Sequence, residues 1–214
     1  MKYFNFEVKD DVIHILEYPS ADMVLTLPDD TYTKRLKDMI LHYTDLQDAK
    51  ARLESIRTEY PKIVNTALTQ NALILFYKCF GKSLFRNNSL KASKILAGFP
   101  PEAKEVFDYY KTLRDKYIVH DESRFSQVFT GAILESESPQ PFLDIVNAVA
   151  IADAYQGEEN QKGLQSFLKL IHVTIEWVNH TIDELTDILK NKFSQLTMSD
   201  FKDFKQLSLD IPDS

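Results

Sequence analysis

The sequence predicts a mainly α-helical protein: a helical bundle with one long C-terminal helix and a small β-hairpin appendage. Glycine accounts for only 5 of the 214 residues, and leucine, lysine, glutamate and alanine are abundant, which favours helices over a β-sandwich. Apolar residues recur at helical spacing over long stretches, whereas alternation of the strand type is short and local. A hydrophobic content of 44% is sufficient for one substantial core, so we expect one structural unit.

The first 28 residues are the predicted β appendage. Apolar residues alternate on both sides of Lys9-Asp10-Asp11, a pattern typical of a β-hairpin. A third short strand is expected over residues 23–27. We therefore expect residues 1–28 to be a structural appendage to a helical domain over residues 29–193.

Helical periodicity begins after Pro28-Asp29-Asp30-Thr31, which is a helix-start signal, and it continues until Pro61. This predicts a helix over residues 31–58. Pro61 can occupy the first turn of a second helix, which stops at Gly81 and should be central because its later half is apolar nearly all round. A further helix opens at Glu102, whose charge suits the positive end of the helix dipole.

The spacing of apolar residues changes from helical to strand-like after residue 124. Residues 125–134 have a strand-like pattern around Gly131, and residues 136–141 form a turn or loop. Residues 142–155 fit either a returning strand or a buried helix. We therefore expect a β insertion at 124–150 within the helical domain.

The clearest periodic pattern starts at Glu159. Apolar residues follow an alternation of four and three residues, which is the seam of a left-handed helix pairing. The helix would be roughly 30 residues or about 45 Å long, and it would be either the spine of the bundle or part of a dimer contact. Residues 194–214 are expected to form a short helix starting near Ser199 and a loose acidic tail. The seam residues are Leu164, Leu168, Ile171, Ile175, Val178, Ile182, Leu185 and Leu189.

The net charge of -7 is unevenly distributed along the chain. Residues 1–60 carry -4 and residues 102–214 carry -9, whereas residues 61–101 contain six basic and no acidic side chains. Such a segment could line a phosphate-binding surface. The alternative is a buried helix that has few charges of either sign.

Several classes of protein are excluded by missing patterns. The N-terminus has no apolar signal core, and no window approaches the ~18 apolar residues of a membrane span, so we expect a cytoplasmic protein that does not bind a membrane. The single cysteine, Cys79, lies in an apolar run and is expected to be a buried thiol. No phosphate-loop motif or metal-ligand spacing is present, and we expect neither a cofactor nor a metal.

The stretch from Arg114 to His120 is the part of the sequence that indicates chemistry. A guanidinium binds phosphate oxygens through a fixed fork of donors, and an imidazole, with an unperturbed pKa of about 6.5, moves protons near neutral pH. On one continuous α-helix the two side chains would lie about 120° apart around the axis and ~9 Å apart along it. Either the helix ends before His120, or each chain's pair completes a site with residues from a neighbouring copy.

A second copy would also solve a chemical problem. Cleavage of RNA by attack of the ribose 2′-hydroxyl needs a base at the nucleophile, an acid at the leaving oxygen and positive charge on the phosphate. A single histidine cannot occupy both proton-transfer positions. Two copies related by a two-fold axis, the commonest symmetry of oligomers, would supply two histidines and two arginines.

The segment from Arg114 to His120 resembles the Arg-x(4 to 6)-His signature of HEPN domains, which are helical nucleases of toxin–antitoxin, abortive-infection and other RNA-targeting defence systems. Asp115 matches the polar residue that follows the arginine in this family. The preceding apolar helix at residues 72–77 and the long helix after the motif are also similar to HEPN layouts, particularly of the abortive-infection branch. The likeness extends over roughly Thr31 to Phe193. It implies an endoribonuclease with a composite cleft at a homodimer interface, held inactive by an antitoxin-type protein partner.

We assign His120 as the proton-transfer catalyst and Arg114 as the group that binds the phosphate and the transition state. Asp115 would orient one of them, while Lys116, Tyr117 and Arg124 would hold the RNA substrate. One alternative is that Arg114 and Asp115 are ordinary solvated charges and that His120 caps a helix. Another is a catalytically silent HEPN-like dimer that acts as a binding or scaffold protein, whose acidity favours a protein partner over RNA.

Overall fold

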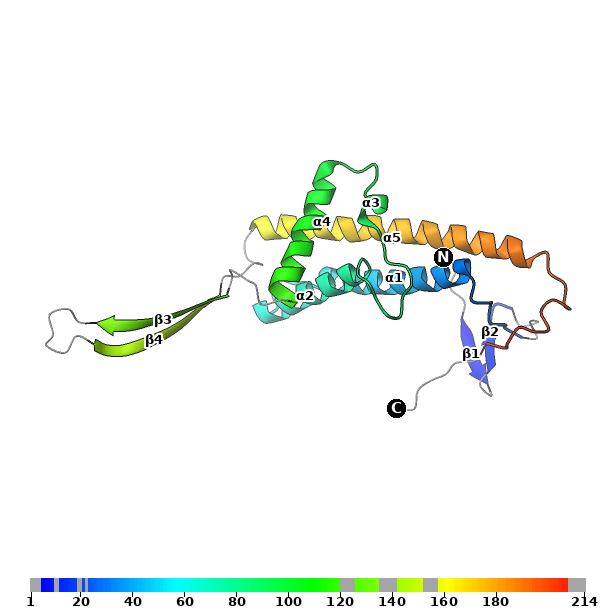
Figure 1. The fold of residues 1–214 in the computed structure, drawn as a ribbon, viewed down its shortest axis with the longest axis horizontal. Helices are drawn as coiled ribbons and strands as arrows, with labels where there is room; N and C mark the ends of the chain where they lie inside the picture. Colours follow the sequence, from blue (N-terminus) through cyan, green and yellow to red (C-terminus); the bar gives the residue numbers. More distant parts are fainter. Residues whose placement is uncertain are drawn as a thin grey trace. The chain divides into compact units, whose positions relative to one another are not determined.

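The computed structural model describes residues 5–9, 12–18, 21, 23–119, 126–134, 142–151 and 158–207 (Figure 1). The prediction of a mainly helical protein with small β elements is confirmed. No helix in the described part of the chain is both long and apolar enough to cross a bilayer. The helices are α1 (Thr31–Glu54), α2 (Lys62–Lys78), α3 (Ala92–Ile95), α4 (Pro101–Leu113) and α5 (Glu158–Phe193), and a π-helical segment, η1 (Arg114–Val119), follows α4.

The chain divides into two compact units. The first unit comprises Met1–Thr44, Lys82–Ser89 and Ile175–Ser214, and the second comprises Asp45–Gly81 and Leu90–Thr174. The long helices α1 and α5 therefore contribute residues to both units.

In the first unit, β1 (Phe6–Lys9) and β2 (Val12–Ile15) form the predicted antiparallel hairpin, with Phe6 opposite Ile15. The predicted third strand does not form. Instead, Leu25 makes an isolated bridge with Gln206. A single bridge cannot extend the sheet, because a strand needs a run of paired residues.

The short helix predicted near Ser199 is also replaced by turns. The Asp200 carboxylate accepts hydrogen bonds from both the backbone N–H and the hydroxyl of Thr197, each at 2.7 Å. Residues 208–214, which include most of the predicted acidic tail, lie outside the described residues.

Helix α1 begins at Thr31 as predicted, because Asp30 caps it. The backbone N–H of Thr33 donates to Asp30 Oδ1 at 2.8 Å. The helix ends at Glu54, four residues before the predicted end at 58, where the Arg57 guanidinium donates to the carbonyl oxygen of Glu54 and so binds the helix terminus.

Asp30 also links α1 to the end of α5 within the first unit. The ammonium group of Lys192 contacts Asp30 Oδ2, and this contact, assisted by the backbone N–H of Thr33, lowers the pKa of Asp30 from 3.8 to about 2. A carboxylate with a lowered pKa stabilises the fold fully above the pKa of the unfolded chain, and the contribution disappears as the pH falls through the folded value.

We therefore expect Asp30→Asn to lower the free energy of unfolding near neutral pH. The wild type should lose stability as the pH falls from about 4 to 2, and the variant should lose less over the same range. Urea unfolding at several pH values in this window measures both effects. An Asp30→Asn variant with the same pH dependence as the wild type would show that the contact with Lys192 contributes nothing. Asp29→Asn, which removes the exposed pair with Lys37, is the matched control.

The core of the second unit is a cluster of aromatic rings from α2, α4 and α5. The ring centroids of Phe76 and Phe167 are 5.2 Å apart, and those of Tyr110 and Phe167 are 4.6 Å apart. Both phenylalanines are fully buried. Helix α2 buries one face, which includes Ala72, Leu73 and Phe76, while Ile74 on the same helix is exposed. Cys79, just after α2, is buried as predicted.

Gly163 allows α4 and α5 to approach closely beside this cluster. A Cβ at this position would lie 2.8 Å from the Tyr110 hydroxyl oxygen, which is closer than real contacts of this kind. Because the Tyr110 ring is stacked on Phe167, it cannot move aside easily.

Helix α5 is 36 residues long and buries the predicted seam from Ile171 onward. Phe167, Leu170, Thr174 and Thr181 are buried as well, so the buried stripe is wider than the seam. This stripe is covered by the chain's own residues.

The strands expected after residue 124 are β3 (Ser126–Leu134) and β4 (Phe142–Ile151), which pair in antiparallel register with Ser126 opposite Ile151. The ambiguity at 142–155 is therefore resolved as a strand over 142–151. The predicted loop at 136–141 and residues 152–155 lie outside the described residues.

Candidate active site at the end of α4

The backbone changes from α-helical to π-helical at Arg114, where the Arg/His stretch begins. Helix α4 ends at Leu113, and η1 covers Arg114–Val119. π-Helical segments are rare and are found frequently at functional sites. The 120° separation applies only to one continuous α-helix, and α-helical geometry ends at Leu113.

The Arg114 side chain is held from two sides. Its guanidinium carbon lies 5.6 Å from the centroid of the Tyr77 ring on α2, a cation–π contact. Its Nη1 atom lies 3.0 Å from Asp115 Oδ1. The side chain is 24% exposed, so it is mostly buried but still reaches the surface. Asp115 therefore forms an ion pair with Arg114.

Tyr77 provides a rigid support for Arg114. Its hydroxyl donates a hydrogen bond to the carbonyl oxygen of Phe107 at 2.6 Å, and its ring belongs to the aromatic cluster. Burial raises the pKa of the Tyr77 hydroxyl above its ordinary value, which outweighs the opposite effect of the nearby Arg114 charge. The phenol thus stays protonated and acts as a donor.

The sequence analysis did not identify Tyr77 as a site residue. Its helix was predicted as a central apolar helix and as part of the family-like layout, but no residue of it was assigned to the site. The available signal was a hydroxyl-bearing side chain within an otherwise apolar run, since a buried tyrosine needs a hydrogen-bond partner and is therefore fixed in place.

The guanidinium of Arg114 is only partly satisfied by the described residues. Its Nε atom is buried and has no hydrogen-bond acceptor among them. The contact with Asp115 uses Nη1 alone and not the two-donor fork of a bidentate pair. Donor capacity of this kind suits an arginine that binds an oxygen-rich ligand.

The other predicted site residues are placed in part. Lys116 is exposed on η1, and Tyr117 belongs to the same segment. His120 and Arg124 lie outside the described residues. The structure therefore brings Arg114 and Asp115 together with Tyr77, and says nothing of the distance from Arg114 to His120.

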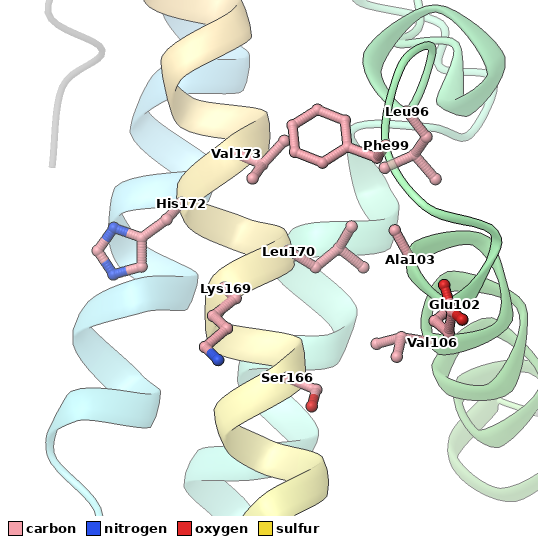
Figure 2. A pocket seen from close by; sticks show the side chains of 10 residues that line it. All are labelled: Leu96, Phe99, Glu102, Ala103, Val106, Ser166, Lys169, Leu170, His172 and Val173. Atoms are coloured by element: carbon pink, nitrogen blue, oxygen red, sulfur yellow. The ribbon is translucent and has the colours of Figure 1, made fainter.

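A separate groove lies between α5 and the chain around α3 and α4 (Figure 2). Its volume is about 480 Å³. Its polar lining residues are Glu102, Ser166, Lys169 and His172. The Ser166 hydroxyl donates to the carbonyl oxygen of Lys162 at 3.1 Å, and Figure 2 shows His172 pointing away from the α4 side, with its Nε2 atom 3.9 Å from Glu54. Most of the lining is apolar. Its apolar lining residues are Leu96, Phe99, Ala103, Val106, Leu170 and Val173.

Comparison with known proteins adds no assignment: no family model, no curated protein and no solved structure matches this chain. The functional argument therefore depends on the residues and their geometry.

Proposed function

We propose that this protein is a metal-independent endoribonuclease of HEPN type, a toxin or phage-defence effector whose composite active site forms at a homodimer interface. The observation that carries the proposal is the fixed Arg114 guanidinium. It is held by Tyr77 and Asp115 at the start of a π-helical segment whose last residue, Val119, directly precedes His120.

In this proposal each residue has a distinct role. Arg114 binds the non-bridging phosphate oxygens and stabilises the charge that develops on them in the transition state. Asp115 keeps the guanidinium in position through its Nη1 contact. His120 transfers protons, and the histidine of the second copy supplies the complementary acid or base. Lys116, Tyr117 and Arg124 hold the RNA.

The proposal implies partners and a location. The substrate is RNA, the assembly is a homodimer, and an antitoxin-type protein would hold the enzyme inactive in the cytoplasm. The exposed Lys116 supports the placement of substrate along η1, because its ammonium group follows Arg114 and Asp115 on the same segment.

The test is incubation of the purified protein with a broad panel of RNAs in EDTA. We expect fragments with 2′,3′-cyclic phosphate ends, because attack by the 2′-hydroxyl leaves this group. Absence of cleavage on the whole panel would favour the alternative, a catalytically silent HEPN-like dimer that binds a protein. The observation that favours this alternative is the same Arg114–Asp115 ion pair, which offsets the charge of the arginine.

A further inference from the structure

The loop Lys82–Ser89 in the first unit presents two apolar side chains to solvent. Leu84 is 101% exposed and Phe85 is 90% exposed, the highest values among the large apolar side chains of the described residues. Exposed apolar side chains that lie next to each other do not stabilise the fold, and they are typical of binding surfaces. The basic residues Lys82 and Arg86 lie on either side of the pair.

The base of this loop is fixed to α1 by buried polar groups. The backbone N–H and the side-chain amide of Asn88 donate to Asp38 Oδ2 at 2.9 and 2.7 Å. The buried imidazole of His42 contacts Arg86 Nη1 through Nδ1 at 3.1 Å and the Asn88 carbonyl oxygen through Nε2 at 2.7 Å. A guanidinium only donates, so Nδ1 must accept and Nε2 must carry the proton.

This anchoring means that the loop is ordered before it meets a ligand. The entropy of fixing the backbone has already been lost on folding, so a ligand that binds at the tip does not have to order the loop. The backbone that carries Phe85 is therefore held close to α1 at Arg86 and Asn88.

The segment of sequence that carries the loop has the opposite charge to the chain as a whole. The loop lies in the segment of residues 61–101 that has six basic and no acidic side chains, whereas the flanking parts of the chain are acidic. Lys82 is exposed, and the carboxylate of Asp38 beneath the loop is buried and bonded to Asn88. An exposed ring close in sequence to an exposed cation, here Lys82, is the combination that binds single-stranded nucleic acid, by stacking of a base on the ring and contact of a phosphate with the cation.

We propose that the loop Lys82–Ser89 is a docking site for single-stranded RNA, with Phe85 as the stacking platform and Lys82 as a phosphate contact. The choice of RNA as the ligand rests on the proposed function. A membrane is the less suitable partner, because two apolar side chains bury little area and stable anchoring to a bilayer needs more.

The test measures binding of a fluorescently labelled single-stranded RNA by anisotropy, in a His120→Ala background so that the RNA stays intact. Phe85→Leu keeps an apolar side chain but removes the ring, and should weaken binding by about 5- to 150-fold. Phe85→Trp should bind as tightly as the parent. Lys82→Ala should reduce the slope of log K against log salt by about 0.7.

The matched control is Ile63→Ala, on α2, which removes another exposed apolar side chain of the same basic segment and should not change binding. Equal affinity of Phe85→Leu and the parent, or binding to phosphatidylserine vesicles but not to RNA, would overturn the inference. Circular dichroism confirms that each variant is folded.

The outcomes separate this inference from the proposed function. RNA binding that depends on Phe85, without cleavage by the wild type, would leave the docking site standing and remove the nuclease assignment. Cleavage by the wild type together with unchanged binding by Phe85→Leu would remove the docking site alone.

Discussion

Replacing His120 with alanine is expected to lower the single-turnover rate of RNA cleavage in EDTA by about 10²- to 10⁴-fold, the usual contribution of a proton-transfer group. The wild-type rate should depend on pH with a bell shape, because one imidazole of the composite site must be neutral and the other protonated. The two apparent pKa values would belong to the pair and not to either histidine. The variant should lose this profile.

The matched control for this prediction is His180→Ala on α5. The His180 side chain is exposed and lies 3.2 Å from Glu184, so its removal should leave the rate unchanged. If His120→Ala is folded and cuts RNA as fast as the wild type, the catalytic role of His120 is wrong.

Phe167→Ala is expected to lower the free energy of unfolding by about 3–5 kcal/mol, the range for truncating a fully buried phenylalanine. Phe167 is 0% exposed and contacts rings from two other helices, Phe76 on α2 and Tyr110 on α4. Its removal therefore leaves a cavity where three helices meet. Urea unfolding followed by circular dichroism measures the loss.

Leu168→Ala is the control for Phe167→Ala, because the two residues are adjacent on α5 and only Leu168 belongs to the seam predicted from the sequence. Leu168 is half-buried, so Leu168→Ala should lower the free energy of unfolding by clearly less than Phe167→Ala. A larger loss at Leu168 than at Phe167 would mean that α5 is rotated relative to the arrangement described here.

Elements with strong local signals were predictable. The hairpin β1–β2, the start of α1 at Thr31 and the long helix α5 follow from alternation, capping and seam periodicity. Each of these patterns is contained in a short stretch of sequence. Such a pattern identifies the type of element and the general direction of its buried face.

Features that depend on competition between local and distant contacts were not predictable. The π-helical backbone of η1 has no signature in spacing. Turns stand where a helix was predicted near Ser199. Phe167 is buried off the seam because rings from α2 and α4 meet there. These partner rings are not visible in the periodicity.

The candidate site follows the same division. Arg114 and Asp115 were found from their order in the sequence, and the structure brings their side chains together. Tyr77 comes from a different helix and was missed, because only packing of α2 against η1 places its ring beside the guanidinium. The loop at Phe85 was likewise hidden, since its basic segment was visible but its exposure was not.

The central claim is that two copies share one active site, and a subunit-mixing experiment tests it most directly. Wild type and inactive His120→Ala are combined in equal amounts and allowed to exchange subunits, and the cleavage rate per wild-type chain is measured in EDTA. If each site needs a histidine from both copies, only about a quarter of the dimers are fully wild type, and the rate per wild-type chain falls to about half. An unchanged rate per wild-type chain would contradict the composite site.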